Sequence, residues 1–197
     1  MSTPLASVLV LDTCVLLSNV LRRLLLTLAQ QSYLTPVWSD VIADEWQRNA
    51  AKLWKYFPQS IEQQWADLER AFPSANLGVV EQYKKGLRHS DPKDWHVIAA
   101  ARAAQAQWPE LSVAVVTRNI KDFNRSELRR VGVGLYEPDE YLYRLAISEP
   151  QAMLAVLHTL PSLMVTPEAQ ALPTNELLRR DRLFRLAQFY KQQEAVA

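Results

Sequence analysis

Short apolar runs alternate along the chain with longer stretches that have helical spacing. Residues 7–11 read Ser-Val-Leu-Val-Leu and stop at a polar position. This pattern is typical of a strand that is buried on both faces in a parallel sheet. Residues 112–117 repeat the pattern, and shorter runs at 33–35 and 133–136 predict two weaker strands. Pro36 would confine the earlier of these to an edge or an end.

Helical periodicity fills the segments between the expected strands. The helices expected there span residues 14–31, 39–56, 61–72, 79–87 and 91–108. The last of them has the clearest start, because Asp91 is followed by a proline at the first helical position and an acid at the third. Strands interleaved with helices imply an α/β protein, a three-layer α/β/α sandwich with a central parallel sheet.

The pattern changes after Glu137, because no further strand is predicted. Helices are expected at residues 138–148, 150–159 and 175–190, and residues 161–173 read as a linker. We therefore predict an α/β domain over residues 1–146, followed by a helical C-terminal extension over residues 147–197.

Composition narrows the class of protein. The 197 residues include 22 Lys and Arg against 21 Asp and Glu, and a net charge of +1 excludes a histone-like nucleic-acid binder. A hydrophobic content of 49% allows a real core and excludes a disordered chain. The single cysteine, Cys14, excludes an intrachain disulfide and zinc sites of paired cysteines, and it fits a reducing cytoplasm. Neither a signal peptide nor an apolar run of the ~20 residues needed to cross a bilayer is visible, so we expect a cytoplasmic protein without a membrane partner.

Acidic residues recur at or near the ends of the predicted strands and at helix starts. They are Asp12, Glu45, Asp91, Asp94 and Asp122. In open parallel sheets, groups at the carboxyl ends of the strands converge on a crevice where ligands bind. Carboxylates gathered in one pocket repel one another unless a cation offsets their charge. Mg²⁺ or Mn²⁺ suits such oxygen ligands and can activate water, so the pattern predicts a divalent-cation site.

Each acid also has a purely structural interpretation. Asp12 and Asp91 could be helix caps, and Asp94 could simply favour the helix dipole. Glu45 could be a solvated side chain and Asp122 a turn residue. Only the shared location of the five favours a functional site.

Four motifs in order make the chain resemble a known family. They read VLDTCVLLS, SDVIADEW, DPKDWHVIAAA and AVVTRNIKDF. Together they resemble the PIN-domain ribonucleases, specifically the VapC-like toxins of type II toxin–antitoxin systems, over about residues 5–145. The resemblance implies a metal-dependent endoribonuclease in which Asp12, Glu45, Asp94 and Asp122 fill the acidic positions, with Asp91 as an addition.

The resemblance also implies a mechanism and partners. Asp12, Asp94 and Asp122 would bind Mg²⁺ or Mn²⁺, and Glu45 would complete the cage or orient the attacking water. In-line attack at phosphorus would leave a 5′-phosphate and a 3′-hydroxyl. An RNA substrate, a cognate antitoxin protein and a homodimer are implied as partners.

Further positions near these motifs are candidates for orienting the site or holding RNA. Thr117 and Asn119 match the polar residues of the last motif, although many relatives have an acid where Asn119 stands. Cys14 stands where the family often has Asn or Ser. Basic residues that could contact phosphates are Lys85, Arg88, Arg118 and Lys121. A solvated face is their alternative interpretation.

Two other functions compete with the nuclease. A phosphatase of the haloacid-dehalogenase type normally has a second Asp two positions after the first, where this chain has Cys14. A catalytically silent PIN-like module that binds RNA or protein is the remaining alternative. His89 and His96 flank the acidic turn and are expected at the surface or behind the ligands. Large aromatics at helical spacing usually pack, so Trp46, Trp54 and Trp65 are expected in the core or at an interface rather than as platforms for RNA bases.

Overall fold

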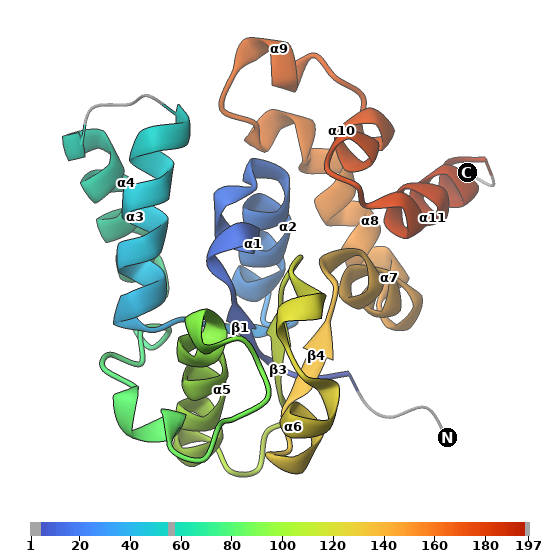
Figure 1. The fold of residues 1–197 in the computed structure, drawn as a ribbon. Helices are drawn as coiled ribbons and strands as arrows, with labels where there is room; N and C mark the ends of the chain where they lie inside the picture. The colour runs from blue at the N-terminus through green and yellow to red at the C-terminus, as the bar shows by residue number, and fades with distance from the viewer. Residues whose placement is uncertain (1–4, 55–57, 196–197) are drawn as a thin grey trace. The chain divides into compact units, whose positions relative to one another are not determined.

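The computed structural model describes residues 5–54 and 58–195 and contains a four-stranded parallel sheet (Figure 1). Its strands are β1 (Val8–Leu11), β2 (Thr35–Val37), β3 (Val113–Val116) and β4 (Gly134–Tyr136), in the order β2-β1-β3-β4. Val10 pairs with Val37 on one side and with Val115 on the other. Helices flank the sheet, so the predicted parallel α/β/α fold is confirmed.

The strand order follows from the residues. Every residue of β1 and β3 is buried, as their continuous apolar runs predict for central strands. Pro36 lies in the edge strand β2, where its missing N–H disturbs no second ladder. In β4, a Cβ added to Gly134 would lie 2.9 Å from the Cβ of Ala114, so only glycine allows this pairing.

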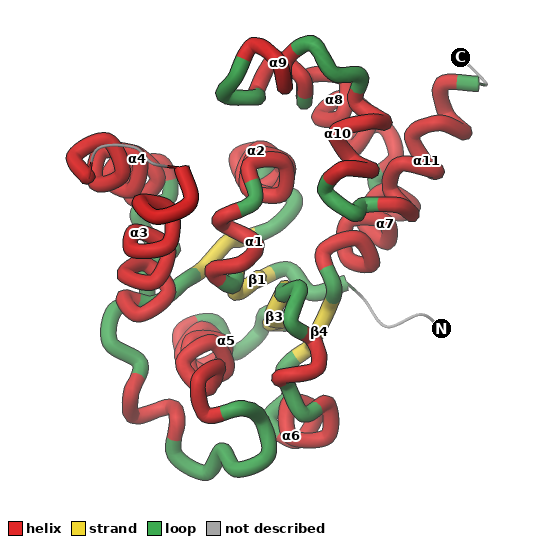
Figure 2. Tube along the Cα trace, turned by 45° about the horizontal axis from the view of Figure 1, so that its top comes forward, coloured by secondary structure: helices red, strands yellow, loops and turns green. Residues whose placement is uncertain are grey.

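The described chain forms two compact units. The sheet unit comprises residues 6–17 and 34–136, and the helical unit comprises Leu5 with residues 18–33 and 137–195. The helices of the sheet unit are α1 (Thr13–Leu17), α3 (Asp40–Trp54), α4 (Pro58–Ala71), α5 (Trp95–Gln107) and α6 (Arg125–Arg130). Its 3₁₀ turns are η1 (Glu81–Lys84), η2 (Pro92–Asp94) and η3 (Ile120–Asp122). Helix α5 lies against β1 and β3, where its buried alanines permit close approach (Figure 2).

Tryptophans fill the space between α3 and α4. The rings of Trp46 and Trp65 are 5.1 Å apart, and Trp38 meets Trp65 edge-on at 5.5 Å. Trp46 also donates through Nε1 to the carbonyl of Leu16 at 3.1 Å. Trp46 and Trp65 are buried, as expected for aromatics in the core, whereas Trp54 is half-buried.

The helical unit collects segments that are distant in sequence. It contains α2 (Asn19–Gln30), α7 (Pro138–Ser148), α8 (Pro150–Thr159), η4 (Pro161–Leu163), α9 (Pro167–Gln170), α10 (Thr174–Arg180) and α11 (Phe184–Glu194). Helix α2 contacts α8, and α11 contacts α7 and α10. The carboxylate of Asp139 accepts the backbone N–H groups of Arg185 at 2.9 Å and Leu186 at 3.1 Å, which ties the start of α11 to α7.

Three expected helices differ in the structure. The helix expected over 14–31 is divided at Ser18, whose hydroxyl caps α2 by accepting the N–H of Leu21 at 3.1 Å. The helix expected over 79–87 is only the turn η1, because Gly78 and Gly86 have positive φ angles that no α-helix contains. The helix expected over 175–190 is broken between α10 and α11, where Arg182 has φ +60°.

Other predicted boundaries shift or stay open. The second strand lies at Thr35–Val37 rather than 33–35. The expected helix end at residue 56 lies outside the described residues. The domain boundary after residue 146 stays a prediction, whereas the packing units change between residues 136 and 137. In the described ranges, no helix has both the length and the apolar character needed to cross a membrane.

Candidate active site

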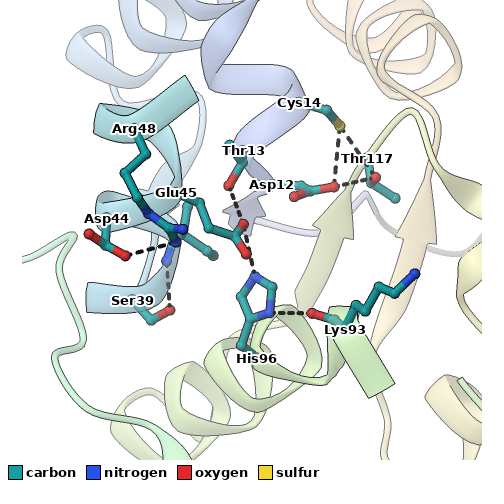
Figure 3. Close-up of polar contacts among 11 residues, drawn as sticks. Asp12, Thr13, Cys14, Ser39, Asp44, Glu45, Arg48, Lys93, His96 and Thr117 are labelled. Atoms are coloured by element: carbon teal, nitrogen blue, oxygen red, sulfur yellow. Dashed lines mark hydrogen bonds and ion pairs between the residues drawn. The ribbon is translucent and has the colours of Figure 1, made fainter. Parts of the chain in front are cut away.

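Asp12 joins the carboxyl ends of the two central strands. It follows β1, is only 4% exposed, and its Oδ2 accepts a 2.6 Å hydrogen bond from the hydroxyl of Thr117, which follows β3. The Cys14 thiol donates to the same oxygen at 3.2 Å (Figure 3). These contacts fix the carboxylate and leave Oδ1 outside both hydrogen bonds.

Cys14 acts here as a neutral hydrogen-bond donor. Burial and the charge of Asp12 raise the pKa of its thiol to about 12. The backbone N–H of Arg118 donates to the sulfur at 3.3 Å, which anchors the turn after β3. The thiol therefore donates a hydrogen bond to Asp12 from the position where the resemblance expects Asn or Ser.

Asp94 is half-buried at the N-terminus of α5, yet its side chain makes no capping hydrogen bond. Burial and the negative charges of Asp12 and Asp122 raise its pKa to about 6. Asp94 thus lies close enough to both Asp12 and Asp122 to be repelled by their charges.

Asp91 has a structural part in the same turn. Its Oδ1 caps η2 by accepting the N–H of Lys93 at 3.0 Å, as the structural interpretation expected. Its own N–H donates to the carbonyl of Asp122 at 2.8 Å. This hydrogen bond fastens the turn that carries Asp94 to the turn that carries Asp122.

Backbone contacts hold the turn after β3. The N–H of Asn119 donates to the Thr117 hydroxyl at 3.0 Å, and the carbonyl of Asn119 accepts the N–H of Asp122 at 2.9 Å. Asn119 is therefore beside Thr117 as the motif implies, and a role for its side chain stays a prediction.

Glu45 reaches the site from α3. Its Oε2 accepts the hydroxyl of Thr13 at 3.0 Å and lies 3.4 Å from Nε2 of His96 (Figure 3). The Nδ1 of His96 is 2.7 Å from the carbonyl of Lys93, so this nitrogen carries a proton. His96 holds the pKa of Glu45 below its ordinary value, and Glu45 raises the pKa of His96 although burial acts in the opposite direction.

The sequence did not predict the parts that Thr13 and Glu127 play in this region, and it placed His96 behind the ligands without naming its partner. Thr13 and His96 hold Glu45, and Glu127 is buried with its carboxylate against the backbone of residues 88–90. The sequence offered a signal for one of them, because Asn124 and Glu127 have the spacing of a capping box. The contact that Glu127 makes with residues 88–90 joins segments far apart in the chain and has no local signature.

The candidate phosphate-binding residues are all exposed. They are Lys85, Arg88, Arg118 and Lys121. Arg118 directly follows Thr117, and Lys121 lies within η3 beside Asp122. Their role in holding RNA stays a prediction.

The donor set suits a hydrated cation. Across residues 5–54 and 58–195, no group of three or more His, Cys, Asp or Glu side chains is arranged to hold a metal ion. Mg²⁺, however, keeps several waters and is commonly bound through one or two carboxylates, so it needs no closed cage. Besides burial, the negative charges of Asp12 and Asp122 raise the pKa of Asp94, and a cation would offset these charges.

Together, these features define an α/β protein with an acidic site at the carboxyl ends of its central parallel strands. Residues 8–121, more than half of the chain, match the family profile of the PIN domain. The chain therefore belongs to the PIN-domain family, whose members are typically nucleases and generally use divalent metal ions. Neither the curated proteins nor the solved structures gave a match.

Proposed function

We propose that this protein is a metal-dependent endoribonuclease. The observation that supports this most is the position of Asp94 beside Asp12 and Asp122 in a chain of a nuclease-type family: burial and the charges of these two acids raise the pKa of Asp94 to about 6. Such an arrangement is unfavourable by itself and is stabilised by a divalent cation.

Asp12, Asp94 and Asp122 would hold Mg²⁺ or Mn²⁺, directly or through water. When bound, the ion neutralises the phosphodiester and lowers the pKa of water. Thr117 fixes one oxygen of Asp12 at 2.6 Å, so the carboxylate is oriented before the substrate arrives. Asp91 caps the turn and adds negative charge beside Asp94.

Glu45 would orient the attacking water or complete the cation site. Thr13 and His96 keep its carboxylate ionised and hold Oε2, which leaves Oε1 for water. Water would then attack in line at phosphorus and leave a 5′-phosphate and a 3′-hydroxyl. The exposed cations Lys85, Arg88, Arg118 and Lys121 would contact the flanking phosphates.

The test is RNA cleavage by purified protein with and without Mg²⁺ or Mn²⁺, comparing wild type with Asp94→Asn. This substitution keeps the size of the side chain but removes its charge, and we expect activity to fall by about 10²-fold or more because a cation-binding charge is lost. Asp44→Asn is the matched control, since Asp44 is exposed and forms an ion pair with Arg48 one turn later on α3 (Figure 3). It should cleave like wild type.

Equal cleavage by wild type and Asp94→Asn with every cation tried would contradict the proposal. Absence of cleavage by both, together with retained RNA or protein binding, would favour the catalytically silent PIN-like module instead.

We further propose that the nuclease is the toxin of a toxin–antitoxin pair, acting in the cytoplasm where its RNA substrate lies. The order of the four motifs supports this, and the acidic pocket suits an antitoxin that inserts a basic residue or a helix. We expect a small gene beside this one, and we expect its product to copurify with the protein and to block RNA cleavage. The molar mass of the free protein in solution tests the further proposal that it forms a homodimer.

A further inference from the structure

We propose that Glu127 is a positioning residue that holds the acidic turn of residues 91–94 against the turn that ends in Asp122. Its carboxylate does so by fixing the backbone of residues 88–90. The inference rests on the proposed function, because it assigns Glu127 a part in arranging the same cation site.

Glu127 lies in the first turn of α6, is only 2% exposed, and its carboxylate accepts three backbone N–H groups. Oε1 accepts the N–H groups of Arg88 at 2.6 Å and His89 at 3.1 Å, and Oε2 accepts the N–H of Ser90 at 2.9 Å. Burial would raise its pKa, but these hydrogen bonds lower the pKa of Glu127 to about 2. The side chain therefore remains a carboxylate at neutral pH.

Ser90, the residue before Asp91, is held at every polar group. Its N–H donates to Glu127, its hydroxyl accepts the N–H of Asn124 at 3.0 Å, and its carbonyl accepts Nε1 of Trp95 at 2.9 Å. Ser90 is only 4% exposed. These hydrogen bonds fix the position of Ser90 and therefore the start of the acidic turn.

Backbone hydrogen bonds connect the residues that follow Ser90 to the turn of Asp122. The N–H of Asp91 donates to the carbonyl of Asp122 at 2.8 Å, and the N–H of Asp94 donates to the carbonyl of Asp91 at 2.9 Å. Without the hydrogen bonds to Glu127, the backbone of residues 88–90 would no longer hold Asp91 and Asp94 in the positions that these two hydrogen bonds require. The separation of the Asp94 and Asp122 carboxylates would then vary, and with it the affinity for a cation.

Capping of α6 does not account for these contacts. Asn124 already caps the helix by accepting the N–H of Glu127 at 2.9 Å. The carboxylate of Glu127 instead points to donors 37 to 39 residues earlier in the chain. Three backbone donors on one buried carboxylate form a contact between segments.

Glu127→Gln tests the inference, because the amide keeps one acceptor oxygen but places an NH₂ group opposite one of the three N–H donors. Asp139→Asn is the matched control, since Asp139 also accepts two backbone N–H groups, at the start of α11. The readouts are the affinity for Mn²⁺ alone, measured by electron paramagnetic resonance, kcat and KM for RNA cleavage, and hydrogen exchange of amides 88–90.

We expect Glu127→Gln to lose protection at amides 88–90 and to weaken Mn²⁺ binding and kcat by about 10-fold or more, as substitutions behind metal ligands do. KM for RNA should change less than kcat, because the side chain of Arg88, which would contact a flanking phosphate, is kept although its backbone is released. Asp139→Asn should change neither the Mn²⁺ affinity nor kcat. Lost protection with wild-type Mn²⁺ affinity and kcat would overturn the inference.

The Mn²⁺ arm separates this inference from the proposed function. If wild type binds Mn²⁺ but cleaves no RNA, the nuclease proposal fails while the comparison of Mn²⁺ affinities still decides the role of Glu127. If wild type binds no Mn²⁺, both fail. If Glu127→Gln does not fold, Ser90→Ala replaces it. This variant keeps the three backbone N–H donors to Glu127 but removes the Ser90 hydroxyl, which hydrogen-bonds the Glu127 carboxylate and accepts the N–H of Asn124. A smaller loss of Mn²⁺ affinity is expected, and an unchanged affinity overturns the inference.

Discussion

Asp94 stands at the N-cap of α5 but leaves the helix uncapped by its side chain. A helix cap is stabilising because its oxygen accepts a backbone N–H, and Asp94 does not use this contact. Its carboxylate instead meets the charges of Asp12 and Asp122. This difference separates Asp94 from Asp91, which does cap its turn.

The raised pKa of Asp94 predicts a pH-dependent cost to the metal-free protein. The folded state holds this proton up to about pH 6, whereas the unfolded chain releases it near 3.8, so stability falls as the pH rises through this window. In EDTA, Asp94→Asn should therefore unfold at a higher temperature than wild type above pH 6, and the difference should vanish below pH 3.8. Thermal unfolding followed by circular dichroism measures this, and a difference that does not change with pH would contradict it.

The residues around Glu45 show the limit of sequence reasoning at this scale. Glu45 could be proposed from its motif, because an acid in the helix after a strand is visible locally. Thr13 and His96 could not be assigned to it, since each is defined only by a contact across many residues. A histidine in an apolar helix gives no sign of which carboxylate it will face.

At the scale of elements, the break between α1 and α2 depends on one side chain. Ser18 accepts the N–H of Leu21 at 3.1 Å and donates to the carboxylate of Asp181 at 2.7 Å. Periodicity continues through this position, so apolar spacing alone predicted one helix. In the sequence, Ser18 only replaces one apolar residue on one face of the expected helix, which does not by itself predict a break.

Ser18→Ala removes this cap and the contact with Asp181. We expect a loss of about 1–2 kcal/mol in the free energy of unfolding, as for other N-cap serines. Urea denaturation measures it. Ser148→Ala is the control, because the Ser148 hydroxyl only donates back to the carbonyl of Leu145 in its own helix, and it should change stability by less than about 0.5 kcal/mol. Equal losses in the two variants would contradict the capping role.

At the scale of the whole molecule, α2 belongs with helices that lie more than a hundred residues later. Leu21, Leu24, Leu25 and Leu28 are buried, and α2 contacts α8, which contributes the buried residues Val156 and Leu157. An early helix thus depends on the C-terminal segment for part of its burial. This bears directly on the predicted domain over residues 1–146.

A chain truncated after residue 146 should therefore fail to fold cooperatively. Removing α8 leaves apolar surface of α2 in water, at a cost of about 25 cal/mol per Å². The expected result is an aggregated or ANS-binding product without a sharp unfolding transition, compared with the full chain under the same conditions. A truncated chain that unfolds cooperatively at the wild-type temperature would instead support the predicted boundary.

The sequence by itself determined the parallel α/β core and the acids at its strand ends. Both depend on local patterns: continuous apolar runs specify strands buried on both faces, and polar residues directly after them fall at one edge of the sheet. Only the tertiary structure decided that α2 packs with α8, that His96 faces Glu45, and that Glu127 holds residues 88–90. These depend on which distant segments meet, and burial, hydrogen bonding and charge select such partners only after the chain has folded.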